Sequence, residues 1–140
     1  MALLPEQING LPIDTTIEYV DYPSLNWYAD PLTHRLTRMC DGKEAMNQSI
    51  EIILAVERFK YSIFTANFGM EYDRLIGSEY GWAASELQRR LEDAFKPDNR
   101  IIGVSDFRFA RPSPDGMLCE FTVNTVYGGI DERMEVSGIR

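Results

Sequence analysis

Apolar residues with helical spacing mark residues 41–58 as the centre of the chain. Four of them fall at i, i+4, i+7 and i+8 and share one stripe of a helix: Met46, Ile50, Ile53 and Leu54. Asp41 precedes the stripe, so its carboxylate can accept from exposed backbone N–H groups, while Glu44 can reach back to the cap. The pattern predicts a core helix that begins after Asp41 and closes at Glu57 and Arg58.

The pattern changes after this helix. Phe59, Tyr61 and Ile63 alternate with polar residues, which predicts a short strand or extended arm. Gly69 then lies in a turn and is expected to adopt a positive φ, and Gly77 closes a second chain reversal. Residues 59–77 should therefore form an aromatic, turn-rich segment.

A second helix is predicted to end at Phe95. Its apolar stripe falls at i, i+3, i+7 and i+11: Ala84, Leu87, Leu91 and Phe95. Glu86/Arg90 and Arg89/Asp93 are opposite-charge pairs at i,i+4, which we expect on the solvent-exposed side. Each such pair contributes only about 0.2–0.5 kcal/mol, so the apolar stripe decides the helix.

Alternating residues predict two hairpins and a tail. Residues 26–28 and 35–39 flank a loop with an Asp-Pro pair, and residues 104–110 and 117–127 flank a proline-rich turn. On the last of these strands, Phe121, Val123 and Thr125 share a face. Gly128-Gly129 should break the chain before a tail in which Met134 and Val136 alternate with charged residues. That tail is either a further strand or a strand lent to a partner.

The order of these elements predicts an α+β fold, with a small, mostly antiparallel sheet of two hairpins packed on two helices. We expect an extended N-terminal arm (1–25), one α+β domain (26–129) and a C-terminal strand-like tail (130–140). The arm is more apolar than a disordered segment requires, so we expect its own domain or another subunit to order it.

Composition narrows the function. A net charge of −8 argues against a nucleic-acid partner, which needs a clustered basic face. Cys40 and Cys119 have no metal-binding spacing and His34 is the only histidine, so no metal or cofactor is expected. A Cys40–Cys119 disulfide is formally open, but free buried thiols are favoured. Without a long apolar run or a leader, we expect no membrane contact and a soluble protein made in the cytoplasm.

Three stretches resemble a known family. They are DGKEAMNQSI from Asp41, ILAVERFKYSIF from Ile53 and NFGMEYDRLIG from Asn67. They resemble XkdS-type baseplate proteins of prophages with contractile tails and, more distantly, the baseplate wedge and sheath-initiator family. The resemblance covers roughly residues 26–128. The family's Glu-Arg element, aromatic-Gly turn and leucine-bearing segment match at Glu57-Arg58, Phe68-Gly69 and Leu75.

The resemblance implies a structural role in the baseplate of a phage or tail-like particle assembled in the host cytoplasm. The chain would join the wedge to the first sheath ring, in several copies around the tail tube, and initiate sheath assembly by strand exchange. Glu57 and Arg58 would contact the wedge, although the proline between them in some relatives is absent here. Phe68, Gly69 and Gly77 would shape turns. We expect strand exchange with the sheath subunit at six residues: Phe121, Val123, Thr125, Ile130, Met134 and Val136.

The sequence is also compatible with two other functions. A tail-completion or tube-contacting module would bind tube or hub proteins. A cell-wall glycoside hydrolase would need two carboxylates, for which Glu57, Glu71 and Asp73 are the candidates. No recognisable catalytic context surrounds these acids, so we predict that the protein is not an enzyme.

Overall fold

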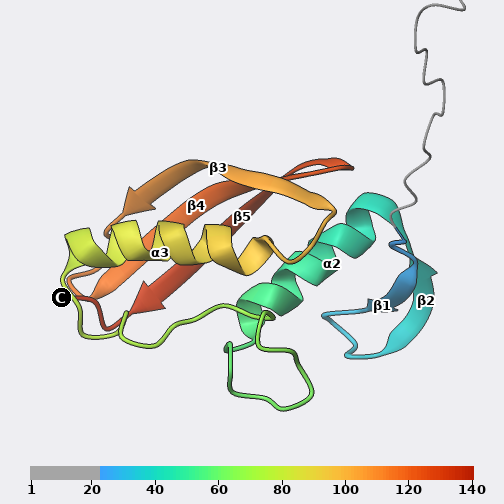
Figure 1. Cartoon of the computed structure of the whole chain (residues 1–140), viewed down its shortest axis with the longest axis horizontal. Coiled ribbons are helices and arrows are strands. Elements are labelled where there is room, and N and C mark those ends of the chain that lie inside the picture. The colour runs from blue at the N-terminus through green and yellow to red at the C-terminus, as the bar shows by residue number, and fades with distance from the viewer. Residues whose placement is uncertain (1–22) are drawn as a thin grey trace, which may run out of the picture.

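The computed structural model describes residues 23–140, so the predicted ordering of the N-terminal arm falls almost wholly outside the described residues. The elements, in chain order, are β1 (Asn26–Ala29), β2 (Leu36–Cys40), α2 (Gly42–Ala55), α3 (Tyr80–Phe95), β3 (Ile101–Ala110), β4 (Gly116–Thr125) and β5 (Gly128–Ser137). They form a two-stranded and a three-stranded antiparallel sheet with the helices packed alongside (Figure 1). The predicted α+β architecture is confirmed.

The first predicted hairpin is confirmed as β1 and β2, which lie beside the start of α2. Gln48 of α2 holds this hairpin. Its side-chain oxygen accepts from Ala29 N–H at 2.9 Å, and its side-chain nitrogen donates to the Trp27 carbonyl at 2.8 Å. The Gln48 amide therefore binds backbone groups of β1 in the way that a neighbouring strand would.

Helix α2 begins where the sequence predicts. The Asp41 carboxylate accepts from Gly42 N–H at 2.7 Å and caps the helix. The predicted reach of Glu44 back to the cap is wrong, because Glu44 instead forms a two-pronged ion pair with Arg38 of β2. The predicted closure at Glu57-Arg58 is also wrong, because the helix ends at Ala55.

The core joins both helices to the three-stranded sheet. The predicted helical stripes are confirmed. Leu54 and Ala84 are partly buried, and the other six members are buried in one cluster with the inner face of β4: Met46, Ile50, Ile53, Leu87, Leu91, Phe95, Cys119, Phe121 and Val123. Cys40 and Cys119 are both buried and unpaired, as predicted. Burial raises the pKa of the Cys119 thiol to about 12, so this residue packs as an apolar side chain.

The three-stranded sheet has the order β3-β4-β5, and α3 lies across one face (Figure 1). The predicted break at Gly128-Gly129 is wrong, because β5 begins at Gly128, which pairs with Thr125. The tail therefore continues the sheet of its own chain. β3 carries an irregularity between Ser105 and Arg108, where Asp106 adopts a φ of 56°.

The segment between the helices differs from the prediction. Residues 59–63 form turns rather than a strand, so the alternation of Phe59, Tyr61 and Ile63 does not reflect sheet pairing. Gly69 does adopt the expected positive φ, at 102°. Gly77, where a chain reversal was predicted, also has a positive φ, at 84°.

Candidate interaction surfaces

A loop of residues 57–70 projects beyond the end of α2 (Figure 1). A parallel bridge between Glu57 and Met70 closes its neck. Arg58 N–H donates to the Met70 carbonyl at 3.0 Å, and Met70 N–H donates to the Val56 carbonyl at 2.9 Å. A Cβ on Gly69 would lie 2.6 Å from that Val56 oxygen, so only glycine fits where the two chain segments approach. The loop is thus compact, with its ends bonded together.

Glu57 and Arg58 hold this loop from within. The Glu57 carboxylate accepts from Tyr72 N–H at 3.1 Å, beyond the far side of the neck. The Arg58 Nε donates to the Ala66 carbonyl at 2.8 Å across the loop. Both side chains are partly buried. The Glu-Arg element therefore shapes the loop through its own chain.

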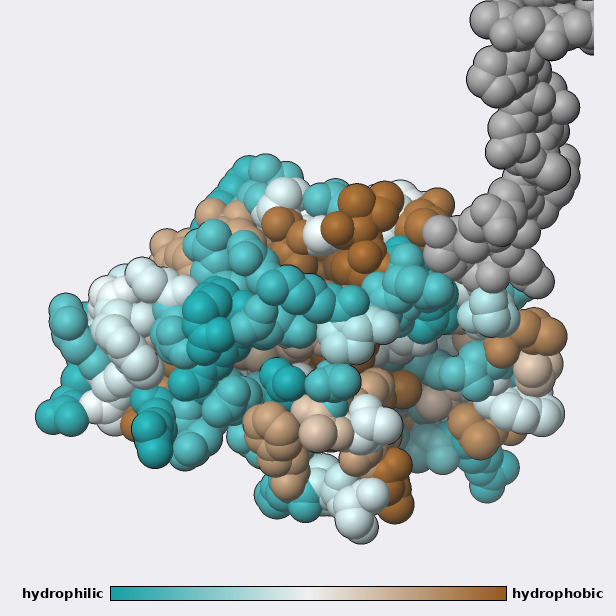
Figure 2. Space-filling model, in the orientation of Figure 1, coloured by the Kyte–Doolittle hydropathy of each residue, from teal (hydrophilic) through white to brown (hydrophobic). Residues whose placement is uncertain are grey.

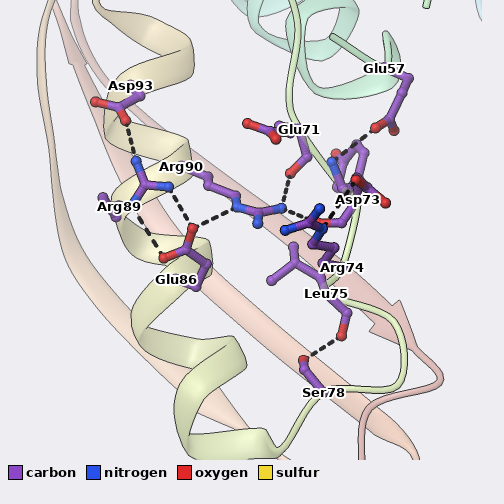
Figure 3. Close-up of polar contacts among 11 residues, drawn as sticks. Glu57, Glu71, Asp73, Arg74, Leu75, Ser78, Glu86, Arg89, Arg90 and Asp93 are labelled. Atoms are coloured by element: carbon purple, nitrogen blue, oxygen red, sulfur yellow. Dashed lines mark hydrogen bonds and ion pairs between the residues drawn. The ribbon is translucent and has the colours of Figure 1, made fainter. Parts of the chain in front are cut away.

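Arg90 of α3 holds the segment that follows the loop, as Figure 3 shows. Its guanidinium donates to the main-chain carbonyls of Glu71 at 2.9 Å and Asp73 at 2.5 Å, and to the Glu86 carboxylate at 2.9 Å. Its side chain is only 8% exposed. The prediction that the Glu86/Arg90 pair faces solvent is therefore wrong for Arg90, which connects α3 to the 71–73 segment.

Glu86 receives a second cation. The Arg89 guanidinium donates to Glu86 and to Asp93 along the exposed side of α3 (Figure 3). The hydrogen bonds from Arg89 and then Arg90 lower the pKa of Glu86 to about 2. The carboxylate is therefore ionised at neutral pH and keeps Arg90 in place.

The outer part of the loop is apolar, with one exposed cation, Lys60. Phe59, Tyr61 and Ile63 are 66%, 48% and 85% exposed. Hydrophobic residues gather at the lower edge of Figure 2, where this loop projects. Residues 58–70 contain Arg58 and Lys60 and no carboxylate, in a chain whose net charge is −8. We call the exposed side chains of Phe59, Tyr61 and Ile63 the apolar knob.

The sheet offers a second kind of surface at its edges. Val126 directly follows β4, and its N–H points toward the β3 side, where it donates to the Arg100 carbonyl at 2.9 Å. Because the backbone groups of successive strand residues alternate in direction, the even-numbered residues of β4 direct their N–H and C=O groups toward β3 and the odd-numbered residues direct theirs toward β5. The odd β4 residues pair with even β5 residues. Hence the odd-numbered residues of β5, from Gly129 to Ser137, direct their N–H and C=O groups away from the sheet.

The six residues predicted for strand exchange lie inside this sheet. Phe121, Val123 and Thr125 are buried on the central strand, with a neighbour on each side. Ile130 and Val136 are buried on β5, and Met134 packs against the same core. Their side chains support the β5 edge from the core side and do not line it.

The end of the tail is bonded to the segment before α3. Gly77 N–H donates to the Gly138 carbonyl at 2.7 Å, and Arg140 N–H donates to the Ser78 carbonyl at 2.8 Å. Tyr80 N–H donates to the Arg140 carbonyl at 2.8 Å, and Ile139 is buried. These contacts anchor β5 at its C-terminal end.

Residues 23–140 show no metal-ligand cluster and no membrane-spanning helix. In that part of the chain, no three His, Cys, Asp or Glu side chains are grouped as metal ligands. None of the helices described is both long and apolar enough to cross a bilayer. Of the three candidate acids, Glu57 accepts a backbone N–H, and Glu71 and Asp73 contribute main-chain carbonyls to Arg90.

Comparison with known proteins identifies the family. The family model described as contractile injection system sheath initiator matches residues 28–128. The chain belongs to the sheath initiators. It is also 30% identical over 135 residues to the phage-like element PBSX protein XkdS of Bacillus subtilis (strain 168), covering 94% of each chain. A structural role in a contractile tail follows for this sheath initiator, since the family is one of tail components and not a class of enzymes.

Two features of this sheath initiator, the burial of Arg90 and the apolar knob, were not predicted from its sequence. Arg90 follows Leu87 by three residues and precedes Ala94 by four, so its position on the buried stripe was a signal for burial. The composition of residues 58–70 was a signal for the apolar knob, because this stretch of an acidic chain combines aromatic residues with two cations and has no carboxylate. The strand-like alternation of the same residues concealed it.

Proposed function

We propose that this sheath initiator joins the baseplate wedge to the first sheath ring and starts sheath assembly by accepting a strand at β5. The observation that carries the proposal is the outward-facing backbone of the odd-numbered residues of β5, an edge strand of the three-stranded sheet. An added strand bonds to such groups, and its main-chain hydrogen bonds supply affinity. The protein would act as a structural part, in several copies around the tail tube, and not as an enzyme.

The fold favours a mechanism in which β5 stays in its own sheet and accepts a strand from the sheath subunit over one in which β5 leaves the sheet to pair with that subunit. Releasing β5 would break its pairing with β4 and expose Ile130, Val136 and Ile139, which are buried. Each apolar side chain of this size contributes about 1.5–3 kcal/mol when fully buried, so release would cost about 5–9 kcal/mol. Adding a strand to the edge requires none of this loss.

The apolar knob supports a separate contact with the wedge. Together with the exposed Lys60, the apolar knob fits an apolar partner surface that carries a carboxylate, such as one face of a wedge helix bundle. Glu57 and Arg58 would act in this contact by holding the loop in shape, since their hydrogen bonds are internal. The wedge and the sheath would then bind different parts of the molecule.

The β5 edge is tested by co-expression with the neighbouring sheath subunit followed by affinity capture. Arg133→Pro removes one outward N–H, and edge strands tolerate proline where the N–H faces solvent. Arg133→Ala is the matched control, because it loses the same side chain and keeps the N–H. We expect Arg133→Ala to capture sheath and Arg133→Pro to fail.

Three results would contradict this proposal. Equal capture by both Arg133 variants would exclude the β5 edge. Capture of tube proteins in place of sheath by the wild type would favour a tube-contacting module. Cell-wall lysis by the purified wild type, lost in Glu57→Gln or Glu71→Gln, would establish a hydrolase.

The wedge contact is tested by replacing Phe59, Tyr61 and Ile63 with serine. We expect the triple variant to lose capture of wedge proteins and to keep capture of sheath, with unchanged thermal stability because these side chains are exposed. Leu32→Ser with Leu36→Ser, on the exposed hairpin, is the matched control. Unchanged wedge capture by the triple variant would overturn the role of the knob.

A further inference from the structure

An apolar groove lies beside the start of β3. It has a volume of about 380 Å³ and runs between the end of α3 and the strand, where Phe95, Ile101, Ile102 and Val104 contribute its apolar lining. The Ile102 side chain is 74% exposed. Figure 2 shows a hydrophobic patch at the upper edge of the molecule, over the start of β3. Because β3 pairs only with β4, its other edge carries backbone groups with no strand partner among residues 23–140.

The N-terminal arm joins the described part of the chain near the start of β3. The Ser24 hydroxyl hydrogen-bonds the Tyr127 hydroxyl at 2.5 Å and accepts from Arg100 at 3.4 Å. Arg100 immediately precedes β3. Followed backward from Ser24 along the β3 edge, the arm would run antiparallel to β3 without any connecting loop.

The sequence of the arm matches this edge. Pro12 and Pro23 bracket ten residues, 13–22, and β3 also has ten residues. As a strand they would span about 33 Å, the length of β3. Residues 15–20 are rich in β-branched and aromatic side chains, and prolines are tolerated at the ends of an edge strand.

We propose that residues 13–22 add to the free edge of β3 of the same chain as an antiparallel strand and cover the groove with their apolar side chains. This inference does not rest on the proposed function. Its consequence is that β3 is closed by the protein itself, which leaves β5 as the edge of this sheet available to another chain.

The test compares amide hydrogen exchange in full-length proteins. Ile17→Pro with Glu18→Pro removes two successive N–H groups, and one of them must face β3 because successive amides alternate in direction. Ile8→Pro with Asn9→Pro, in the same arm but outside residues 13–22, is the matched control. We expect the β3 amides that point away from β4 to be protected in the wild type and the control, and to exchange at least about tenfold faster in the 17/18 variant.

Amides on the other side of the sheet provide the internal reference. Exchange of the β4 amides should be equal in all three proteins, because their partners lie within residues 101–137. Unprotected outward amides of β3 in the wild type, or equal exchange in the 17/18 variant, would overturn the proposal. Protection that disappears on dilution, together with a dimer in light scattering, would overturn it in favour of exchange between two chains.

Discussion

Arg90→Met tests whether Arg90 holds the 71–73 segment against α3. Methionine keeps the length of the side chain and removes its donors, so the carbonyls of Glu71 and Asp73 lose their bonds to Arg90. An acceptor left unsatisfied in a buried position costs about 1–3 kcal/mol. Two such acceptors, partly relieved by water, give an expected loss of about 3 kcal/mol in the free energy of unfolding. Arg89→Met is the control, because Arg89 is 56% exposed and pairs with the same Glu86.

The assay is urea unfolding followed by circular dichroism at neutral pH. With an m-value of about 1.5 kcal/mol per molar urea, Arg90→Met should lower the midpoint by about 2 M. Arg89→Met removes exposed ion pairs that contribute about 0.2–1 kcal/mol each, so its midpoint should fall by well under 1 M. Equal midpoints for the two variants, at unchanged m-value, would refute the assignment of Arg90 as an internal anchor.

Three further predictions concern single residues. Gly69→Ala should lower the free energy of unfolding by about 1–3 kcal/mol in the same assay, because the new Cβ would lie 2.6 Å from the Val56 carbonyl oxygen at a φ of 102°. Gly77→Ala should lower it less, because nothing lies within 4 Å of a Cβ at that position. Arg89 and Arg90 lower the pKa of Glu86 to about 2, so the Glu86 carboxylate stabilises the fold fully above the usual carboxyl pKa. The difference in unfolding free energy between the wild type and Glu86→Gln should therefore shrink as the pH falls from 4.5 toward 2. A difference that stays constant over this pH range would contradict the prediction. Because burial raises the pKa of Cys119 to about 12, a thiol reagent at pH 8 should label Cys119 only at the rate of unfolding, and immediate labelling in native buffer would show that the thiol is accessible.

The helices and hairpins were accessible to prediction because local spacing determines them. The α2 stripe at Met46, Ile50 and Ile53 and the alternation of β4 through Phe121 and Val123 record which face is buried, and the structure buries those faces. A turn signal was less decisive. Gly128-Gly129 resembles a chain break, yet both glycines pair across the sheet, because β4 offers partners along the full length of β5.

The features that create the candidate surfaces depend on contacts between distant residues. Arg90 is buried because carbonyls 17 and 19 residues away meet it, and i,i+4 charge spacing alone points to solvent. Phe59, Tyr61 and Ile63 alternate as in a strand, but the bridge between Glu57 and Met70 closes them into a loop. Spacing within one element carries no information about such closures, so the loop and its anchor required the structure.

Hydrogen exchange of the sheath initiator bound to its sheath subunit tests the central claim most directly. In the complex, the odd-numbered amides of β5 from Gly129 to Ser137 should become protected, while the even-numbered amides, already paired with β4, should change little. That alternation would identify strand addition at β5. Binding of sheath with no new protection among the odd-numbered β5 amides would contradict the account.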